Sequence, residues 1–192
     1  VEVLGPAGSR SAVVCSLVTE GGERSMASDR GAAADLRPEE IEAPWLNGCD
    51  HLFVSGHVLG SEASRRAALR AVEVARAGRA SVSVDLASWL AIRDAGPNAF
   101  RTAVEELAPD VVFANEDEDR AVGGPLPGVT WILKRGPRGC SFDGDERTAL
   151  PVERVVDSTG AGDALAAGWI VGGADLALEA AARCVAGLGS MP

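Results

Sequence analysis

The stretch "DSTGAGDALAAGWI", residues 157–170, decides how the rest of the chain is interpreted. Its first half combines acids, hydroxyl residues and small residues, and an apolar run follows directly. Small residues allow a tight turn that brings backbone N–H groups close to a ligand. The first turn of a helix also carries unpaired N–H donors and partial positive charge. Gly160, Ala161 and Gly162 are therefore predicted to form an anion hole at a helix start, suited to a phosphoryl group.

Asp163 follows this turn and precedes the apolar segment. A carboxylate in such a place costs stability unless it has a partner or a task. One interpretation is a general base that accepts a proton from a substrate hydroxyl as its oxygen attacks phosphorus. The alternative is an ordinary helix start, in which Asp163 only stabilises the helix dipole. The turn is neither a dinucleotide-binding fingerprint, because Leu165 stands at the third glycine position, nor a Walker A loop.

Hydrophobic patterning and capping residues predict alternating strands and helices. Strands are expected at 11–18, 23–28, 51–56, 80–86, 111–115, 130–134, 139–144 and 147–152. Helices are expected from Pro38 to about residue 46, from Ser61 to Ala77, before Pro109, at 116–124, at 161–171 and at 175–188. This alternation implies an α/β fold with a mostly parallel sheet that is covered on both faces.

Ligands of such sheets bind beyond the carboxyl ends of the strands. Three polar clusters fall at such ends: Asp85, residues 115–119 and residues 134–139. Each also has a plainer interpretation. Asp85 suits a helix cap, the acids of 115–119 suit a solvated helix start, and "KRGPRG" suits a hairpin turn.

Composition limits the classes of function. The 192 residues suit either one sizeable domain or one domain with a small appendage. The net charge of −10 argues against nonspecific binding to nucleic acid or to an anionic membrane. The four cysteines form no C-x-x-C pair, so we expect reduced, mostly buried thiols and a cytoplasmic protein rather than a zinc site. The longest uncharged apolar run, 164–174, is about half the length that spans a membrane.

Three motifs in order resemble those of the ribokinase family, the PfkB carbohydrate and nucleoside kinases. "DSTGAGD" (157–163) resembles the second family signature, "VFANEDE" (112–118) the N-x-x-E motif, and "ILKRGPRGC" (132–140) the K-x-G-x-x-G hairpin. "EGGER" (20–24) and "RGA" (30–32) resemble segments beside the β-lid of the family. The resemblance implies a three-layer α/β/α core over residues 31–192 and a remnant of the lid or edge strands over residues 1–30.

The resemblance also implies ATP-dependent transfer of the γ-phosphoryl group to a hydroxyl of a sugar or nucleoside. Asp163 matches the catalytic base, and Gly160, Ala161 and Gly162 match the anion hole. The other matching positions are nucleotide-binding Asn115, Lys134, Gly136 and Gly139, Glu118 near Mg²⁺ through water, and Asp157 near a monovalent cation such as K⁺.

The chain also departs from the family pattern. "DLASW" (85–89) lacks the asparagine and arginine of the sugar-kinase branch, and the first third of the family has no counterpart. Three functions therefore stay open: an active kinase, a truncated kinase-like protein that binds nucleotide or acts as a scaffold, and another α/β transferase with the same anion hole. The expected partner is a small molecule, with no nucleic acid and no membrane, and a lid-mediated homodimer is the alternative to a monomer.

Overall fold

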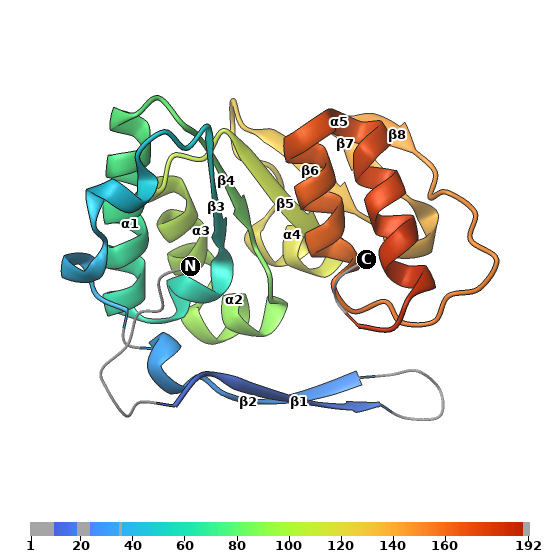
Figure 1. The fold of residues 1–192 in the computed structure, drawn as a ribbon, viewed down its shortest axis with the longest axis horizontal. Helices are drawn as coiled ribbons and strands as arrows, with labels where there is room; N and C mark the ends of the chain where they lie inside the picture. Colours follow the sequence, from blue (N-terminus) through green and yellow to red (C-terminus); the bar gives the residue numbers. More distant parts are fainter. Residues whose placement is uncertain (1–9, 19–23, 35, 190–192) are drawn as a thin grey trace.

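The computed structural model of the protein describes residues 10–18, 24–34 and 36–189. Its larger sheet has the order β3-β4-β5-β6-β7-β8, with β3 to β6 parallel and β7 and β8 antiparallel. The strands are β3 (His51–Ser55), β4 (Ser81–Asp85), β5 (Val111–Asn115), β6 (Thr130–Lys134), β7 (Cys140–Phe142) and β8 (Asp145–Arg147). The predicted α/β class with a mostly parallel sheet is confirmed (Figure 1).

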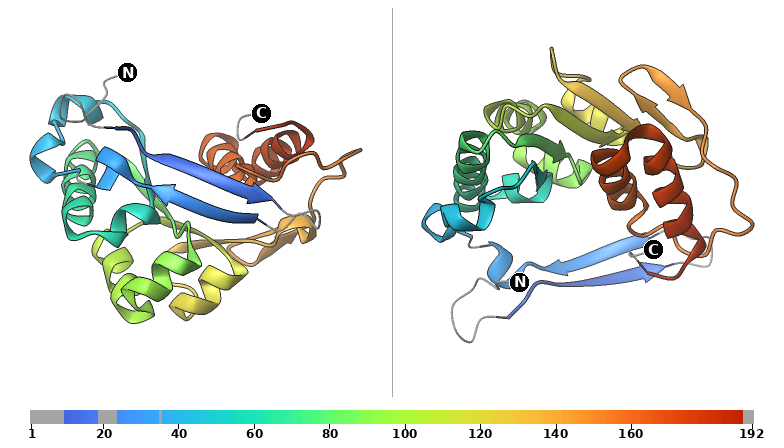
Figure 2. Two further views of the ribbon diagram at one scale, coloured as in Figure 1. Left: turned by 90° about the horizontal axis from the view of Figure 1, so that it is seen from below. Right: turned by 45° about the horizontal axis from the view of Figure 1, so that its top comes forward.

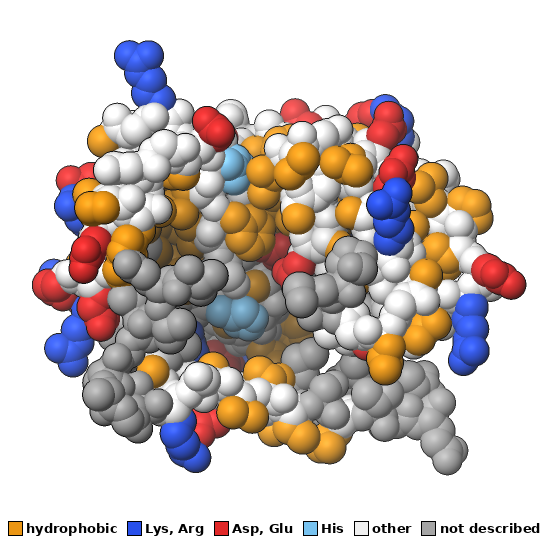
Figure 3. All heavy atoms as spheres, in the orientation of Figure 1, with side chains coloured by type: hydrophobic (Ala, Val, Ile, Leu, Met, Phe, Trp, Pro, Cys, Tyr) orange, Lys and Arg blue, Asp and Glu red, His pale blue; other side chains and the backbone are white. Residues whose placement is uncertain are grey.

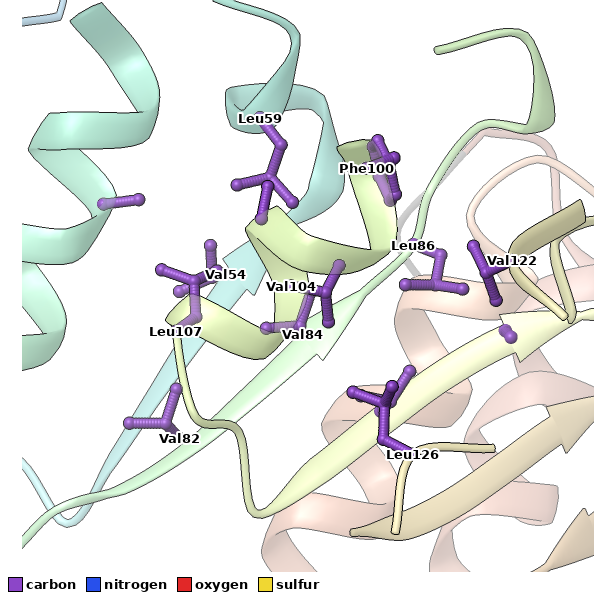
Figure 4. Close-up of a cluster of buried hydrophobic side chains, with 14 of the residues drawn as sticks. Val54, Leu59, Val82, Val84, Leu86, Phe100, Val104, Leu107, Val122 and Leu126 are labelled. Atoms are coloured by element: carbon purple, nitrogen blue, oxygen red, sulfur yellow. The ribbon is translucent and has the colours of Figure 1, made fainter. Parts of the chain in front are cut away.

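Helices cover both faces of this sheet (Figure 2). They are α1 (Glu62–Ala77), α2 (Trp89–Ala95), α3 (Pro97–Glu106), α4 (Glu116–Val122) and α5 (Ala161–Ala186). Successive strand residues point to opposite faces. Val82 and Val84 accordingly belong to the core on the side of α1 to α4 (Figure 4), and Val112 belongs to the same cluster. Phe113 and Ile132 belong to a second core, packed against α5.

The long helix α5 is a helical hairpin. Gly172 and Gly173 have non-helical backbone angles. Gly173 has a φ of 74°, which is sterically unfavourable for residues that carry a Cβ atom. Its two halves lie side by side in both figures. By length and composition alone α5 could cross a membrane, but each half is too short, because about 20 helical residues are needed.

A separate two-stranded antiparallel sheet precedes the core. β1 (Val13–Val18) and β2 (Arg24–Asp29) pair from Val13↔Asp29 to Val18↔Arg24. Figures 1 and 2 show this ribbon running along the edge at which the parallel strands end. Hydrophobic side chains lie on its surface (Figure 3), with Val13, Val14 and Leu17 more than half exposed. Its assignment as a lid remnant stays a prediction, and residues 1–9 and most of "EGGER" lie outside the described residues.

The structure corrects two expectations and contains one helix that was not expected. Residues 38–46 form two short 3-10 turns, Pro38–Glu40 and Ala43–Leu46, because Pro44 interrupts the segment, so the predicted helix there is wrong. The last strand covers Asp145–Arg147 rather than 147–152. Helix α2 was not expected from the sequence. By contrast, the predicted cap of α1 is confirmed, since Ser61 accepts a hydrogen bond from the Ser64 N–H.

The cysteine prediction is confirmed in part. Cys140 and Cys184 are buried, Cys49 is half-buried and Cys15 is exposed, and all four are free thiols. Burial raises the pKa of the Cys140 thiol to about 12, so this thiol stays protonated at neutral pH.

The close contact inside α5 gives a test of the hairpin. A Cβ atom on Gly168 would lie 2.6 Å from the Leu176 carbonyl oxygen and 2.8 Å from the Ala177 Cα atom. Gly168→Ala is therefore expected to lower the free energy of unfolding by about 1–3 kcal/mol, measured by urea denaturation. Ala167→Ser, at an exposed neighbouring position, is the control and should change it by less than about 0.5 kcal/mol. Equal stability of the two variants would contradict the packing of the hairpin.

Candidate active site

Strand pairing brings the predicted polar clusters to one edge of the sheet. Asp85, Asn115 and Lys134 are the last residues of β4, β5 and β6. The register pairs Asn115 with Lys134 and Asp85 with Phe113. All three residues therefore lie at the carboxyl edge, where ligands of open α/β sheets bind.

An ion pair links two of these strand ends. Lys134 Nζ donates to Asp85 Oδ2 over 2.5 Å, and the two side chains are 16% and 6% exposed. The other carboxylate oxygen, Asp85 Oδ1, accepts from the Ala87 N–H over 2.9 Å. Asp85 thus stabilises the turn that follows β4 and holds the ammonium group. The cap of the next helix, α2, is Ser88, so the helix-cap interpretation of Asp85 is wrong.

Lys134 also lies against the glycine turn. A Cβ atom on Gly162 would stand 3.4 Å from Lys134 Nζ, so the ammonium group contacts the first turn of α5. Gly160 is the residue before the helix and has φ 79°, and, as a glycine, it has no side chain that could cap the helix start. Ala161 N–H makes a long bond of 3.4 Å to the Ser158 carbonyl oxygen. The predicted anion hole therefore lies at a real helix N-terminus with a cation beside it.

Asp163 is the third residue of α5 and is exposed. Its neighbours in the helix, Gly162 and Ala164, carry no large side chain that could cover the carboxylate. Burial raises the pKa of the Cys184 thiol most, and the nearby carboxylates of Asp157 and Asp163 raise it further. The Asp163 carboxylate is therefore near Cys184 in the second half of α5, and its exposure leaves it open to a ligand.

Asn115 and Glu118 form the N-terminal cap of α4. Asn115 Oδ1 accepts from the backbone N–H groups of Asp117 and Glu118, each over 2.9 Å. Glu118 Oε2 accepts from the Asn115 N–H over 2.8 Å, which completes a capping box. The predicted helix start is thus confirmed, but it is not solvated throughout, because Glu118 is buried. The nucleotide and metal roles of the two residues stay predictions.

Glu118 is a buried carboxyl group, 3% exposed. Burial raises its pKa, and Asp85 and Asp117 raise it further, against the hydrogen bond from Asn115 and the charge of Lys134. Within the described residues, no group of three or more metal-binding side chains comes together. A single carboxylate of this kind fits Mg²⁺ that keeps most of its waters and binds mainly to phosphate oxygens.

The glycines of the hairpin between β6 and β7 have a structural reason. Gly136 has φ 56° and Gly139 has φ 101°. A Cβ atom on Gly139 would lie 2.0 Å from the Arg147 carbonyl oxygen. In the same hairpin Arg138 pairs with Glu116 and Arg135 pairs with Glu146. These contacts explain the turn without a nucleotide, so the nucleotide roles of Gly136 and Gly139 stay predictions.

Asp157 ties the glycine turn to the end of α5. Its Oδ1 accepts from the Thr159 N–H over 2.8 Å, and its Oδ2 accepts from the Gly189 N–H over 3.3 Å. Asp157 therefore supports the shape of the turn, and its role toward a monovalent cation stays a prediction.

The ion pair of Asp85 with Lys134 was not predicted from the sequence. Each of the two residues was a candidate site residue by itself, and only the strand pairing brings them together.

Residues 6–191 match the pfkB family carbohydrate kinase. The chain belongs to this family. It is 30% identical over 193 residues to the ATP-dependent ribose-1-phosphate kinase of Halopiger xanaduensis, covering 91% of this chain and 60% of that relative. The chain thus spans about three fifths of the length of this curated relative.

Solved structures of the pfkB fold agree with this assignment. The adenosine kinase of Sinorhizobium meliloti superposes with a TM-score of 0.83 at 24% identity, covering 94% of this chain and 62% of that one. A protein of E. coli designated ribokinase II, crystallised with ATP and Mg²⁺, superposes with a TM-score of 0.74 at 26% identity, covering 93% and 66%. These superpositions confirm the ribokinase-like three-layer α/β/α fold that the resemblance of the motifs implies for this protein.

The raised pKa of Glu118 gives a pH-dependent test. A carboxyl group whose pKa is raised on folding stabilises the protein below its unfolded pKa, and this contribution is lost as pH rises through the folded pKa. Glu118→Gln keeps an acceptor for the Asn115 N–H and removes the buried charge. Its melting temperature should equal that of the wild type near pH 4 and exceed it increasingly toward pH 7. Glu73→Gln, at an exposed position, is the control, and a wild type more stable than Glu118→Gln at pH 7 would contradict the assignment.

Proposed function

We propose that this chain carries the phosphoryl-transfer site of an ATP-dependent kinase whose acceptor is a hydroxyl group of a sugar or nucleoside. One observation supports this most directly. Lys134, the start of α5 after Gly160 and the exposed Asp163 carboxylate lie close together at the carboxyl edge of the sheet. A cation, backbone donors and a base at one place are the groups that transfer to a hydroxyl requires.

In the proposed mechanism the backbone N–H groups of Gly162 and Asp163 donate to oxygens of the transferred phosphoryl group. The Lys134 ammonium, next to Gly162, neutralises part of the negative charge on these oxygens. The Asp163 carboxylate accepts the proton of the acceptor hydroxyl as that oxygen attacks phosphorus. The helix dipole of α5 adds positive potential at the same point.

Mg²⁺ would neutralise charge on the nucleotide phosphates. Glu118 is the residue that would hold it through water, because Asp85 is already bonded to Lys134 and to Ala87. The complex of the E. coli ribokinase II with ATP and Mg²⁺ supports this pairing of cofactor and nucleotide. K⁺ near Asp157 remains a weaker part of the proposal.

The acceptor is proposed from the relatives. The curated relative phosphorylates ribose 1-phosphate by its name, and several structural neighbours are adenosine kinases. A ribose unit is common to both, so the first acceptors to test are ribose, ribose 1-phosphate and adenosine. The second candidate function, nucleotide binding without transfer, uses the same α5 start and Lys134.

Asp163→Asn tests the proposed base. Loss of the base should reduce phosphoryl transfer from ATP by about 10²–10⁴-fold, measured by coupled assay against the three ribose compounds. Binding of Mg·ATP, measured by calorimetry, should change by less than about threefold, because the N–H donors remain. Asp175→Asn, on an exposed residue of the same helix, is the matched control and should retain full activity.

The same experiment separates the two candidate functions. Wild-type turnover that is lost in Asp163→Asn supports the kinase. Retained turnover in Asp163→Asn would refute the assignment of the base. Binding of Mg·ATP by the wild type without turnover on any of the three acceptors would favour the non-catalytic function.

A further inference from the structure

We propose that Asp85 is a positioning residue for phosphate recognition, which holds the ammonium group of Lys134 against the start of α5. The proposal rests on the function proposed above and adds a residue to that site. Asp85 belongs to a different strand from Lys134, 49 residues away in the chain. Neither the general base nor the anion hole includes it.

The position of Lys134 is electrostatically unfavourable without a counter-ion. Its Nζ lies 3.4 Å from the Cβ position of Gly162, in the first turn of α5. The N-terminal end of a helix carries partial positive charge, which repels a cation. An anion must therefore offset this repulsion before a phosphate arrives, and the Asp85 carboxylate is 2.5 Å from the ammonium group.

Asp85 is held firmly enough to act as this anchor. Its side chain is 6% exposed, and its second oxygen is fixed by the Ala87 N–H. Ala87 has φ 63°, so the turn after β4 adopts a conformation that is unusual for alanine. A lysine ammonium has three N–H donors, and the bond to Asp85 uses one of them. The anchored ammonium can thus still donate to a phosphate.

The choice of lysine supports a specific role at this place. The chain has 18 lysines and arginines, and Lys134 is the only lysine. All other cationic positions therefore use a guanidinium group, which is planar and bulky, whereas an ammonium group is a compact point charge. The Lys134 ammonium lies 2.5 Å from Asp85 Oδ2 and 3.4 Å from the Cβ position of Gly162, so a compact cation is close to both groups.

A double-mutant cycle tests whether Asp85 acts through Lys134. In the full chain, Asp85→Asn is expected to weaken Mg·ATP binding about tenfold, a size common for coupled neighbours. Lys134→Met should weaken binding by a similar factor, and Asp85→Asn should have no further effect in the Lys134→Met background. Asp94→Asn, an exposed aspartate paired with Arg93, is the matched control and should bind as the wild type does.

Because the chain has one lysine, labelling with ¹³C-lysine also gives a direct spectroscopic readout of Lys134. In the wild type its two Hε protons should have different chemical shifts, because the side chain is fixed. In Asp85→Asn they should merge into one averaged signal. Asp85→Ser, whose hydroxyl can still accept from Ala87 N–H, is the second variant if Asp85→Asn does not fold.

Each outcome decides the question. If the wild type binds Mg·ATP and both Asp85 variants bind equally well, or if Asp85→Asn weakens binding as much without Lys134 as with it, the positioning role is refuted. An unchanged Lys134 signal in the Asp85 variants refutes it as well. If the wild type binds no Mg·ATP, the proposed nucleotide site itself fails, and the positioning proposal falls with it.

Discussion

The parallel pairing of β4, β5 and β6 is the constraint on which the rest of the structure depends. It places the last residue of each strand at one edge, so that residues far apart in the chain become neighbours. The ion pair between Asp85 and Lys134 bridges β4 and β6 across the end of β5. The glycine turn then needs only to end beside this pair for a helix start, a cation and a carboxylate to meet.

Helix α5 covers one face of the sheet, and both an aromatic contact and a small residue allow it to pack there. Phe113 of β5 packs edge-on against Trp169 of α5, with ring centroids 5.8 Å apart. The second half of α5 reaches the first because Gly168 allows its backbone to approach Leu176 and Ala177. The apolar run after Asp163 therefore serves as one arm of a packed hairpin, and this arm holds the glycine turn in place.

Much of the fold could be predicted from local sequence. The strands of the parallel sheet and the helix after Ser61 carry strong patterns of hydrophobicity and capping, and these elements are found where they were expected. The short turns at 38–46 and helix α2 were mispredicted, since proline placement and a positive φ at Ala87 decide them. Such backbone details depend on tertiary contacts that a local pattern does not contain.

The candidate site likewise has parts that could be predicted from local sequence and parts that could not. The helix start at Gly160 and the cap formed by Asn115 and Glu118 are local features, and their positions follow from spacing. The partnership of Asp85 with Lys134 depends on strand order and register, so the sequence showed two candidate residues and no pair. The close approach of Gly139 to Arg147 likewise depends on the pairing of β7 with β8.

Within the described residues, the β1–β2 ribbon is joined to the core through few contacts. Near its base, Ala32 N–H bonds the Arg10 carbonyl oxygen, and Arg30 donates to the His57 carbonyl oxygen. Among the described residues, its two strands contact each other far more than they contact the core. Little of the free energy of folding the core is therefore shared with them. The ribbon is therefore expected to open as its own cooperative unit, with amide hydrogens that exchange well before those of the central strands.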